Sequence, residues 1–364
     1  MKKAFVFLAF VSVIVSCNRE TDDFIWEKSY GEGSAFYINS LSDSGVVSCG
    51  TVNDSPYILK LDKDKKTEFE YFSPHKGSFS SVWFANGSRY VAGGASDGKM
   101  LLSCIGEKGN LIWDTLITAS FKIRTTGIVS TVSGSLTAAG TASSDSVESG
   151  TSGILFVRFN IEGVISEKKE TAESNFVAAG RITTDGSGNI LIPLTRKKLY
   201  NESQSSIAKY SGELNRLWET ELYNNTNFGA SGSSALADEA GNVFVTGSTE
   251  LSSADSVLNN SFLAAISSSG TVLWKKYLEK TNSGAAVIFD TDGLLMVLNT
   301  NCFIVSKAEP ENGADAGTIK MFQVCNSKTT DAFGKDIDLY YDGNIIVAGS
   351  KGGNYYLALE SYLQ

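Results

Sequence analysis

The chain has 364 residues, of which 42% are hydrophobic and 20% are charged, with 35 Gly and only 4 Pro. It is long enough to bury a large core and too apolar to be intrinsically disordered. The formal net charge is −9 and the pI is about 4.9. Because an acidic surface repels phosphate backbones, we do not expect a nucleic-acid partner.

Residues 1–16 are predicted to be a lipoprotein signal peptide. Lys2 and Lys3 form a basic start, and the apolar run Ala4–Val15 that follows is too short to span a bilayer. The run ends in Ile14-Val15-Ser16-Cys17, which resembles the bacterial lipobox. This resemblance implies that Cys17 is lipidated and becomes the mature N-terminus. The alternative interpretation is an ordinary secretory signal that happens to contain a cysteine.

Residues 17–23 comprise this cysteine and a short acidic tether, Asn18–Asp23. The tether is similar to the stretches that direct lipoproteins to the cell surface in some Gram-negative lineages. More than one acyl chain on Cys17 would give stable anchoring in a membrane. The sequence therefore predicts a lipoprotein of the cell envelope and outer membrane, held through its lipid, and leaves exposure on the cell surface open.

Residues 24–364 contain a repeated pattern of short apolar runs separated by turns. The clearest unit, Ser233–Tyr277, has four runs, with turns at Asp238–Asn242 and Ser267–Gly270. Asn86-Gly87 between two apolar runs of another unit is a strong hairpin signal. Seven units can be counted by their second runs, which are residues 46–50, 90–94, 135–140, 190–194, 243–247, 294–298 and 345–349.

The last unit contains three runs and no fourth, whereas Phe24–Tyr30 resembles a fourth run and precedes the first unit. We therefore predict an all-β fold: a monomeric seven-bladed β-propeller with four-stranded antiparallel blades, in which the N-terminal strand closes the last blade. The units resemble bacterial propeller repeats with a DG-x-x-x-x-AG-S/T…W pattern and, more distantly, quinoprotein-like blades. A ring of six or eight blades is the alternative.

Two sets of repeated residues have structural interpretations. A glycine near the end of the second run suits either a positive φ or a close backbone approach. An aromatic residue in the fourth run is expected to fill the space between blades, with a sugar-stacking platform as the alternative. Trp83 differs because it lies on a first run, near the expected central channel. The glycines are Gly50, Gly94, Gly140, Gly247 and Gly349, and the aromatics are Trp26, Phe69, Trp113, Trp218 and Trp274.

Several units carry a phenylalanine shortly before the first run. These residues either plug the space between blades or form an apolar pocket at the channel mouth. They are Phe36, Phe79, Phe121, Phe176, Phe228 and Phe333.

The candidate ligand site lies on three predicted long loops, Thr141–Gly153, Thr195–Ser206 and Ser248–Ser261. They should share one face of the propeller, and loops on a rigid scaffold commonly carry binding residues. The middle loop holds a basic cluster that could bind an acidic sugar or a partner's carboxylate; the alternative is a solvated loop. The cluster comprises Arg196, Lys197, Lys198, Tyr200 and Asn201.

Catalytic motifs are scarce. The one histidine, His75, has no metal-ligand spacing around it, so we expect no metal site and no cofactor. Ser267–Trp274 resembles a degenerate Asp-box of the sialidase type without its aspartate, and Asp290 and Asp292 fit hairpin turns. A pair of carboxylates from distant blades stays open as an alternative.

The cysteines other than Cys17 fall into two groups. Cys302 and Cys325 lie at facing ends of two predicted antiparallel strands, so we predict that an exported protein can join them in a disulfide. Cys49 and Cys104 lie inside strands and are expected to be buried thiols.

The function predicted from the sequence is a binding or scaffold module for a glycan or an envelope protein, without enzymatic activity. A glycan-active hydrolase or lyase that uses carboxylates at the channel mouth is the alternative. A cofactor-dependent quinoprotein is a more distant one.

Overall fold

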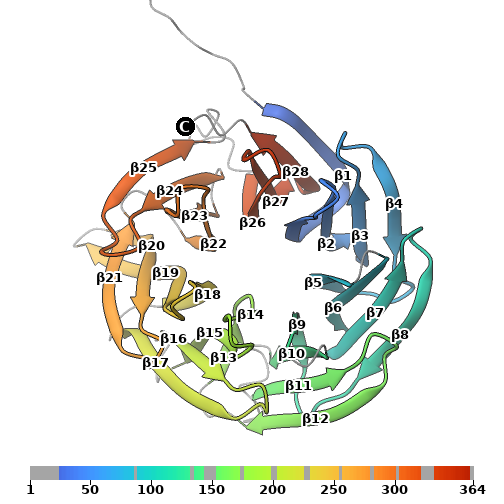
Figure 1. The fold of residues 1–364 in the computed structure, drawn as a ribbon, viewed down its shortest axis with the longest axis horizontal. Helices are drawn as coiled ribbons and strands as arrows, with labels where there is room; N and C mark the ends of the chain where they lie inside the picture. The colour runs from blue at the N-terminus through green and yellow to red at the C-terminus, as the bar shows by residue number, and fades with distance from the viewer. Residues whose placement is uncertain are drawn as a thin grey trace, which may run out of the picture.

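The computed structural model describes residues 24–360 apart from 86–87, 132–134, 143–152, 173–175, 198–202, 225–229, 254–255, 279–282, 301–302 and 321–331. Within these residues the secondary structure is all β, and the antiparallel sheets surround a central opening (Figure 1). In the same part of the chain, no helix has both the length and the apolar character needed to cross a membrane. Cys17, Cys302 and Cys325 lie outside the described residues, so their predicted lipidation and disulfide stay predictions.

The largest sheet has seven strands in the order β26-β27-β28-β1-β2-β3-β4. Its strands are β1 Phe24–Ser40, β2 Val46–Val52, β3 Ser55–Leu61, β4 Thr67–Phe72, β26 Ala332–Leu339, β27 Ile345–Lys351 and β28 Asn354–Glu360. The first half of β1 pairs with β28 and its second half pairs with β2. The change of partner falls at Gly31 and Gly33, where Gly31 has a φ of 71°, a conformation that favours glycine.

Two four-stranded sheets follow. One comprises β5 Ser78–Ala85, β6 Arg89–Ser96, β7 Lys99–Gly106 and β8 Leu111–Ile117. The other comprises β9 Ile123–Ser130, β10 Leu136–Ala142, β11 Gly153–Phe159 and β12 Ile165–Ala172.

The next sheet contains β13 Phe176–Ala179, β14 Thr183–Thr184, β15 Ile190–Lys197, β16 Ser203–Tyr210 and β17 Arg216–Asn224, with β13 and β14 both paired to β15. Two more sheets complete the described part. They are formed by β18 Ala230–Ala237, β19 Val243–Ser253, β20 Ser256–Ile266 and β21 Val272–Leu278, and by β22 Gly284–Phe289, β23 Leu295–Asn299, β24 Ile304–Ala308 and β25 Asp315–Lys320.

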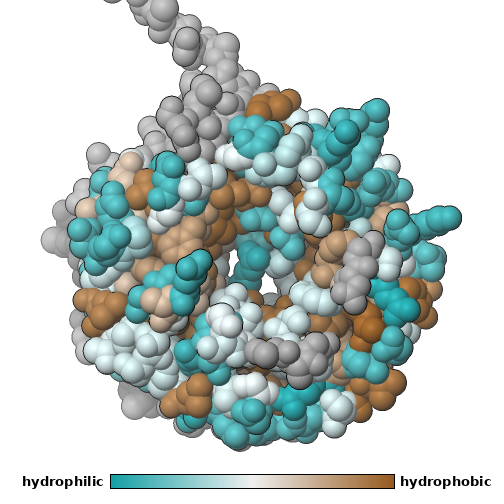
Figure 2. Space-filling view, viewed as in Figure 1, coloured by the Kyte–Doolittle hydropathy of each residue, from teal (hydrophilic) through white to brown (hydrophobic). Residues whose placement is uncertain are grey.

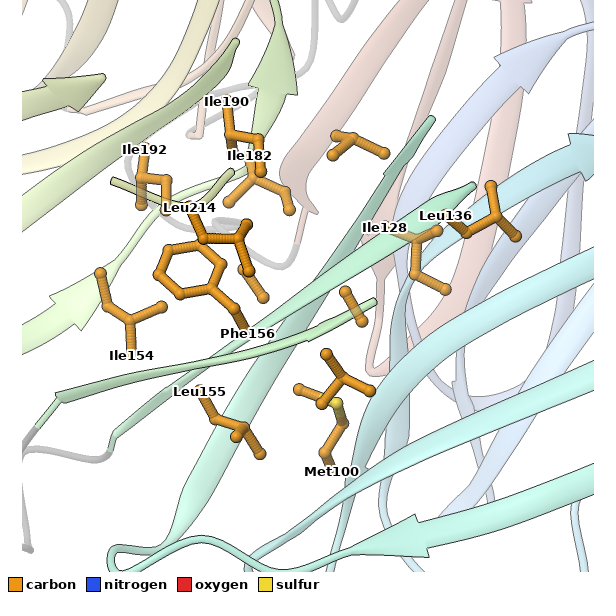
Figure 3. Packing of buried hydrophobic residues seen from close by; sticks show 14 of the residues in the cluster. Met100, Ile128, Leu136, Ile154, Leu155, Phe156, Ile182, Ile190, Ile192 and Leu214 are labelled. Atoms are coloured by element: carbon orange, nitrogen blue, oxygen red, sulfur yellow. The ribbon is translucent and has the colours of Figure 1, made fainter. Parts of the chain in front are cut away.

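The core lies between neighbouring sheets. Middle strands are buried on both faces, which explains their continuous apolar runs, whereas the outer strand β4 alternates buried and exposed residues. In Figure 3, Ile154 and Phe156 of β11 lie close to Ile190 and Ile192 of the following sheet. Cys49 and Cys104 are buried free thiols, as predicted.

The fourth-run aromatics join adjacent sheets, as expected of packing residues. The indole Nε1 groups of Trp113, Trp218 and Trp274 donate to the carbonyls of Ile161, Ser268 and Pro310, at 3.0, 3.0 and 2.9 Å. Each of these carbonyls belongs to the turn before the outer strand of the next sheet. The indole rings pack over a glycine of the same turns, Gly163, Gly270 and Gly313. A larger residue at these glycines would collide with the ring.

The aspartates of the predicted hairpin turns are structural. Asp290 accepts hydrogen bonds from the backbone N–H groups of Asp292 and Leu294, at 2.9 and 2.8 Å, and pairs with Lys307. Asp185 pairs in the same way with Lys209, and Asp43 with the buried Lys60. The Asp290/Asp292 pair is therefore explained by the turn, as the sequence indicates.

The predicted loop Ser248–Ser261 is wrong in extent, because β19 continues to Ser253 and β20 begins at Ser256. The predicted loop Thr195–Ser206 is also shorter, with β15 ending at Lys197 and β16 beginning at Ser203. Polar composition alone suggested loops, but serine and threonine are compatible with a strand when the partner strand satisfies the backbone.

Candidate functional site

A one-residue bulge recurs in the first strands, including β13, where Val177 is the extra residue, and in the six other units the extra residue lies at the central opening. The register between β1 and β2 moves from Ala35↔Gly50 to Tyr37↔Cys49, so Phe36 is the extra residue. A bulge places an extra residue out of the ladder and bends the strand. The extra residues in the six strands are Phe36, Ser80, Arg124, Ser233, Ala285 and Lys335, which we call the bulge ring.

The bulges explain the repeated glycines of the second run. A Cβ on Gly50 would overlap the carbonyl oxygen of Ser34, which the bulge directs against the neighbouring strand. A Cβ on Gly94, Gly247 or Gly349 would likewise overlap a backbone carbonyl oxygen of the first strand in the same unit. Of the two explanations left open for these glycines, the structure supports the close backbone approach, since none of the four has a positive φ. Gly140 instead faces the side chains of Met100 and Ile123.

The remaining sheet has a wider irregularity at the corresponding place. β13 pairs as far as Ala179↔Leu194 and β14 resumes at Thr183↔Leu191, so the three residues Gly180–Ile182 lie opposite Ile192 and Pro193, and the N–H of Gly180 donates to the Pro193 carbonyl at 2.8 Å. Proline has no N–H to donate to a partner strand, and within sheets it is found at such interruptions.

The interruption is fixed from both sides. Gly180 lies against the backbone carbonyl of Ser233 on β18, where a Cβ would not fit. The N–H of Arg181 donates to that same carbonyl at 2.7 Å. On the other side, Ile182 occupies the space above Gly127 of β9. These contacts direct the Arg181 side chain toward the central opening.

Arg181 crosses the opening to the seven-stranded sheet. Its guanidinium forms an ion pair with Asp336 of β26 and lies over the ring of Tyr37, with 4.4 Å from Cζ to the ring centroid. Asp336 is 0% exposed and also accepts the N–H of Ile38 at 2.9 Å. Burial raises the pKa of Asp336 to about 6, although the charge of Arg181 opposes this shift.

A cavity of about 660 Å³ lies at this opening, and every member of the bulge ring lines it. Its described lining contains three cations, Arg124, Arg181 and Lys335, and no aspartate, glutamate, histidine or cysteine. Phe36, Tyr37 and Trp83 add aromatic surface, and serine and threonine hydroxyls make up much of the rest. Figure 2 shows hydrophilic residues at the central opening.

Lys335 is the most informative cation of the cavity. Its side chain is accessible at the opening, and the surrounding wall lowers its pKa through loss of hydration. Its ammonium makes no hydrogen bond or ion pair with any residue that the structure describes. An anion entering the cavity would supply the missing counter-charge.

The carboxylates near the opening are fixed by other contacts. Asp336 is engaged by Arg181, and Asp338 accepts the N–H of Ser40 at 2.6 Å. Burial raises the pKa of Asp338 as well. Neither side chain is part of the cavity wall, so the described residues offer no pair of carboxylates facing a ligand.

The predicted loop cluster is only partly described. Arg196 lies in β15 and forms a two-point ion pair with Glu219 of β17, at 2.5 Å for Nε–Oε1 and 2.7 Å for Nη2–Oε2. Burial opposes ionisation of Glu219, but the bonds from Arg196 outweigh it and lower the pKa of that carboxyl. The side chain of Lys197, and all of Lys198, Tyr200 and Asn201, lie outside the description.

The other sequence candidates occupy different places. Trp83 and Phe36 line the cavity, whereas Phe79 and Phe121 are buried in the core and Phe333 is 41% exposed. The side chain of Phe176, and Phe228 as a whole, are not described. His75 bonds to Asp114 of β8 at 3.0 Å, away from the cavity. Within the described residues, no group of three or more candidate ligands is placed to bind a metal.

Sequence reasoning missed the three cavity cations. A usable signal exists for Lys335, because aligning the first runs places it in the same column as Phe36, Ser80, Ser233 and Ala285. Arg124 lies outside this column, since its bulge falls two pairs beyond Gly140. Arg181 falls one position after the column, beside the glycine that takes the ring position in its unit. Without knowledge of the bulges, nothing marked this column as facing the opening.

Comparison with known proteins bears on the fold. No family model and no curated protein sequence matches the chain. The structure is similar to a catalytically inactive virginiamycin B lyase from Staphylococcus aureus with quinupristin, with a TM-score of 0.62 at 12% identity over 92% of this chain and 99% of that one. The chain has a β-propeller fold.

Two further propellers are similar to it. The Pan2 WD40 domain of Neurospora crassa has a TM-score of 0.61 at 9% identity, covering 91% of this chain and 90% of that domain. The polysaccharide lyase Uly1 has a TM-score of 0.59 at 10% identity, covering 90% of both chains. At such identities the similarity extends to the fold alone, because one fold hosts many functions.

Proposed function

We propose that the protein is a lipid-anchored, seven-bladed β-propeller of the cell envelope that binds a glycan or a protein partner without transforming it. The cavity wall is the observation that carries this proposal. It offers cations, aromatic rings and hydroxyls, which are binding groups, and its described part lacks a carboxylate, imidazole or thiol. Small-molecule sites typically combine apolar surface with a few polar groups in this way.

The blade count rests on the pairing of β1. With its second half assigned to β2–β4 and its first half to β26–β28, the strands group into seven sets with one first strand each. In this arrangement β1 closes the ring by belonging to two blades. We also propose that the domain is a monomer, since a closed ring leaves no long unpaired edge.

The alternative of a glycan-active hydrolase or lyase needs an acid and a base at the cavity. The described wall offers Tyr37 and Lys335 as ionisable groups that could transfer a proton, and burial raises the pKa of Tyr37 to about 12, which is the wrong direction for a base at neutral pH. The pair of carboxylates on which this alternative depends is not part of the described wall. The similarity to lyases concerns the fold. We therefore favour the binding function.

The binding proposal is tested with residues 24–364, which contain every described strand. The protein is applied to a glycan array and used to capture proteins from detergent-solubilised envelopes of the source cells. Reproducible capture of one glycan class or one partner supports the proposal. Turnover of a bound glycan, or a failure to bind in both formats, contradicts it. A Lys197→Ala/Lys198→Ala variant tests whether the loop after β15 contributes.

Anchoring is tested separately with the full chain. We expect palmitate labelling of the wild-type protein and its recovery in the outer-membrane fraction. The Cys17→Ser variant should lose both properties, because the lipobox cysteine is the acceptor. Equal fractionation of the two proteins would contradict the anchor.

A further inference from the structure

We propose that the central cavity is a binding site for a small acidic sugar, whose carboxylate is recognised by Lys335, Arg124 and Arg181. This inference rests on the proposed binding function and adds a ligand class and a location to it. The site is distinct from the basic cluster that begins at Arg196, because Arg196 lies near the end of β15 and forms an ion pair with Glu219.

The charge of the cavity favours an anion. The chain as a whole carries a formal charge of −9, yet three cations face this space, and the carboxylates of Asp336 and Asp338 behind Arg181 offset only part of their charge. An excess of positive charge in a concave site on an acidic protein attracts anions selectively, because the field is concentrated there. A bound carboxylate would form charge-assisted hydrogen bonds with these groups.

Lys335 provides the anchor. It is the extra residue of the β26 bulge, so its position in the opening is imposed by the backbone. Its ammonium has no partner within the described residues, and the wall that surrounds it reduces its hydration. A cation held in this way gains more from a bound anion than a solvated surface lysine does.

The uncharged part of the wall fits a sugar ring. The hydroxyls of Thr183, Thr184 and Ser233 line the cavity and make no hydrogen bond to another described residue. They are therefore available to sugar hydroxyls. Tyr37 and Trp83 present aromatic surface in the same space, which suits the apolar face of a pyranose. A mineral anion would use the cations but leave the hydroxyls and rings without a role.

The size of the cavity limits the ligand. A volume of about 660 Å³ lies in the range of small-molecule sites, roughly 300–1,000 Å³. Arg181 also crosses the opening to Asp336, which narrows the path for a polymer passing through the ring. We therefore infer that the occupant is a monosaccharide, a disaccharide or the end of a longer acidic glycan.

Isothermal titration of residues 24–364 with D-glucuronate, D-galacturonate, D-glucose and sulfate tests the inference. We expect at least one uronate to bind, and neither glucose nor sulfate to match it. Lys335→Met should weaken uronate binding by about tenfold or more, and Lys335→Arg should retain much of it. Lys99→Met is the matched control, because Lys99 is an exposed strand residue outside the cavity.

Circular dichroism and melting temperature verify that each variant is folded, and Lys335→Ala serves as a second substitution. Absence of uronate binding to the folded wild-type protein overturns the inference. So does sulfate binding as tight as uronate binding, or uronate binding that Lys335→Met leaves unchanged. An envelope partner that is captured equally by wild type and Lys335→Met, without uronate binding, would retain the proposed function and remove the sugar site.

Discussion

Replacement of Gly50 by alanine should destabilise the protein strongly, because the obstacle to the new methyl group is backbone. An added Cβ would overlap the Ser34 carbonyl oxygen and stand 3.0 Å from both the Ser34 carbonyl carbon and Ala35 Cα. Carbon atoms in contact are optimally ~3.5–4.0 Å apart. The bulge at Phe36 would have to move to make room.

The expected loss of unfolding free energy follows from two opposing effects. Overpacking a closely packed site typically costs about 1–3 kcal/mol, and a rigid obstacle places Gly50→Ala at the upper end. The lower entropy of the unfolded alanine chain returns about 0.4–1 kcal/mol. We expect a net destabilisation of about 2 kcal/mol.

Equilibrium unfolding in urea measures this loss, with Gly186→Ala as the matched control. Gly186 has an ordinary φ, and an added Cβ there would meet nothing within 4 Å. Gly186→Ala should leave the free energy of unfolding unchanged or raise it slightly. If Gly50→Ala unfolds within about 0.5 kcal/mol of the wild type, the reasoning from backbone overlap is wrong.

Three other substitutions test contacts described above. Asp185→Asn should cost about 3 kcal/mol at pH 7 by leaving the buried Lys209 unpaired. Burial alone would raise the pKa of Asp185, but hydrogen bonds from Asn189 and Lys209 outweigh it and lower this pKa. The stability that the Asp185 carboxylate adds is therefore fully present at pH values above the ordinary pKa of an aspartate and is lost as the pH falls through the lowered pKa. The difference in unfolding free energy between Asp185→Asn and the wild type, measured with urea, should therefore shrink below about pH 4. A difference that stays constant with pH would contradict this role of the carboxylate. Arg181→Met should lower the free energy of unfolding by about 3 kcal/mol, because it leaves the buried Asp336 without its ion-pair partner. A double-mutant cycle with Asp336→Asn should give a coupling energy above about 1 kcal/mol, and additive effects would refute the ion pair across the opening. Trp218→Phe should lower the free energy of unfolding by about 1 kcal/mol or more, because it keeps an aromatic ring but loses the pyrrole part of the indole and the hydrogen bond to Ser268. An unchanged stability in thermal or chemical unfolding would argue against that bond.

Much of the architecture could be predicted because it depends on local patterns. Aspartate-containing turns, continuous apolar middle runs and outer aromatics recur in most units, and the structure uses those described as expected. The repeated glycines could be limited to two explanations, a positive φ or a close backbone approach. The direction of that approach could not be predicted, because it comes from a bulge in the partner strand.

The cavity was not predictable from the same patterns. Arg181 and Asp336 are separated by 155 positions and meet because their strands face one opening. Pro193 interrupts the ladder and frees the segment that holds Arg181, an effect that needs the register between β13, β14 and β15. The basic cluster Arg196–Asn201 could be recognised because it is contiguous in the sequence, whereas the cavity cations are dispersed along the chain.

The double pairing of β1 has a consequence for the order of assembly. Glu27 and Tyr356 are 329 positions apart and are joined by a hydrogen bond. Contacts between such distant positions require closure of nearly the whole chain, and folds rich in them form slowly. During synthesis or export from the N-terminus, the first half of β1 must wait for the last strand to emerge. Until then the emerging protein exposes unpaired strand edges, and protection by chaperones would matter most in that interval.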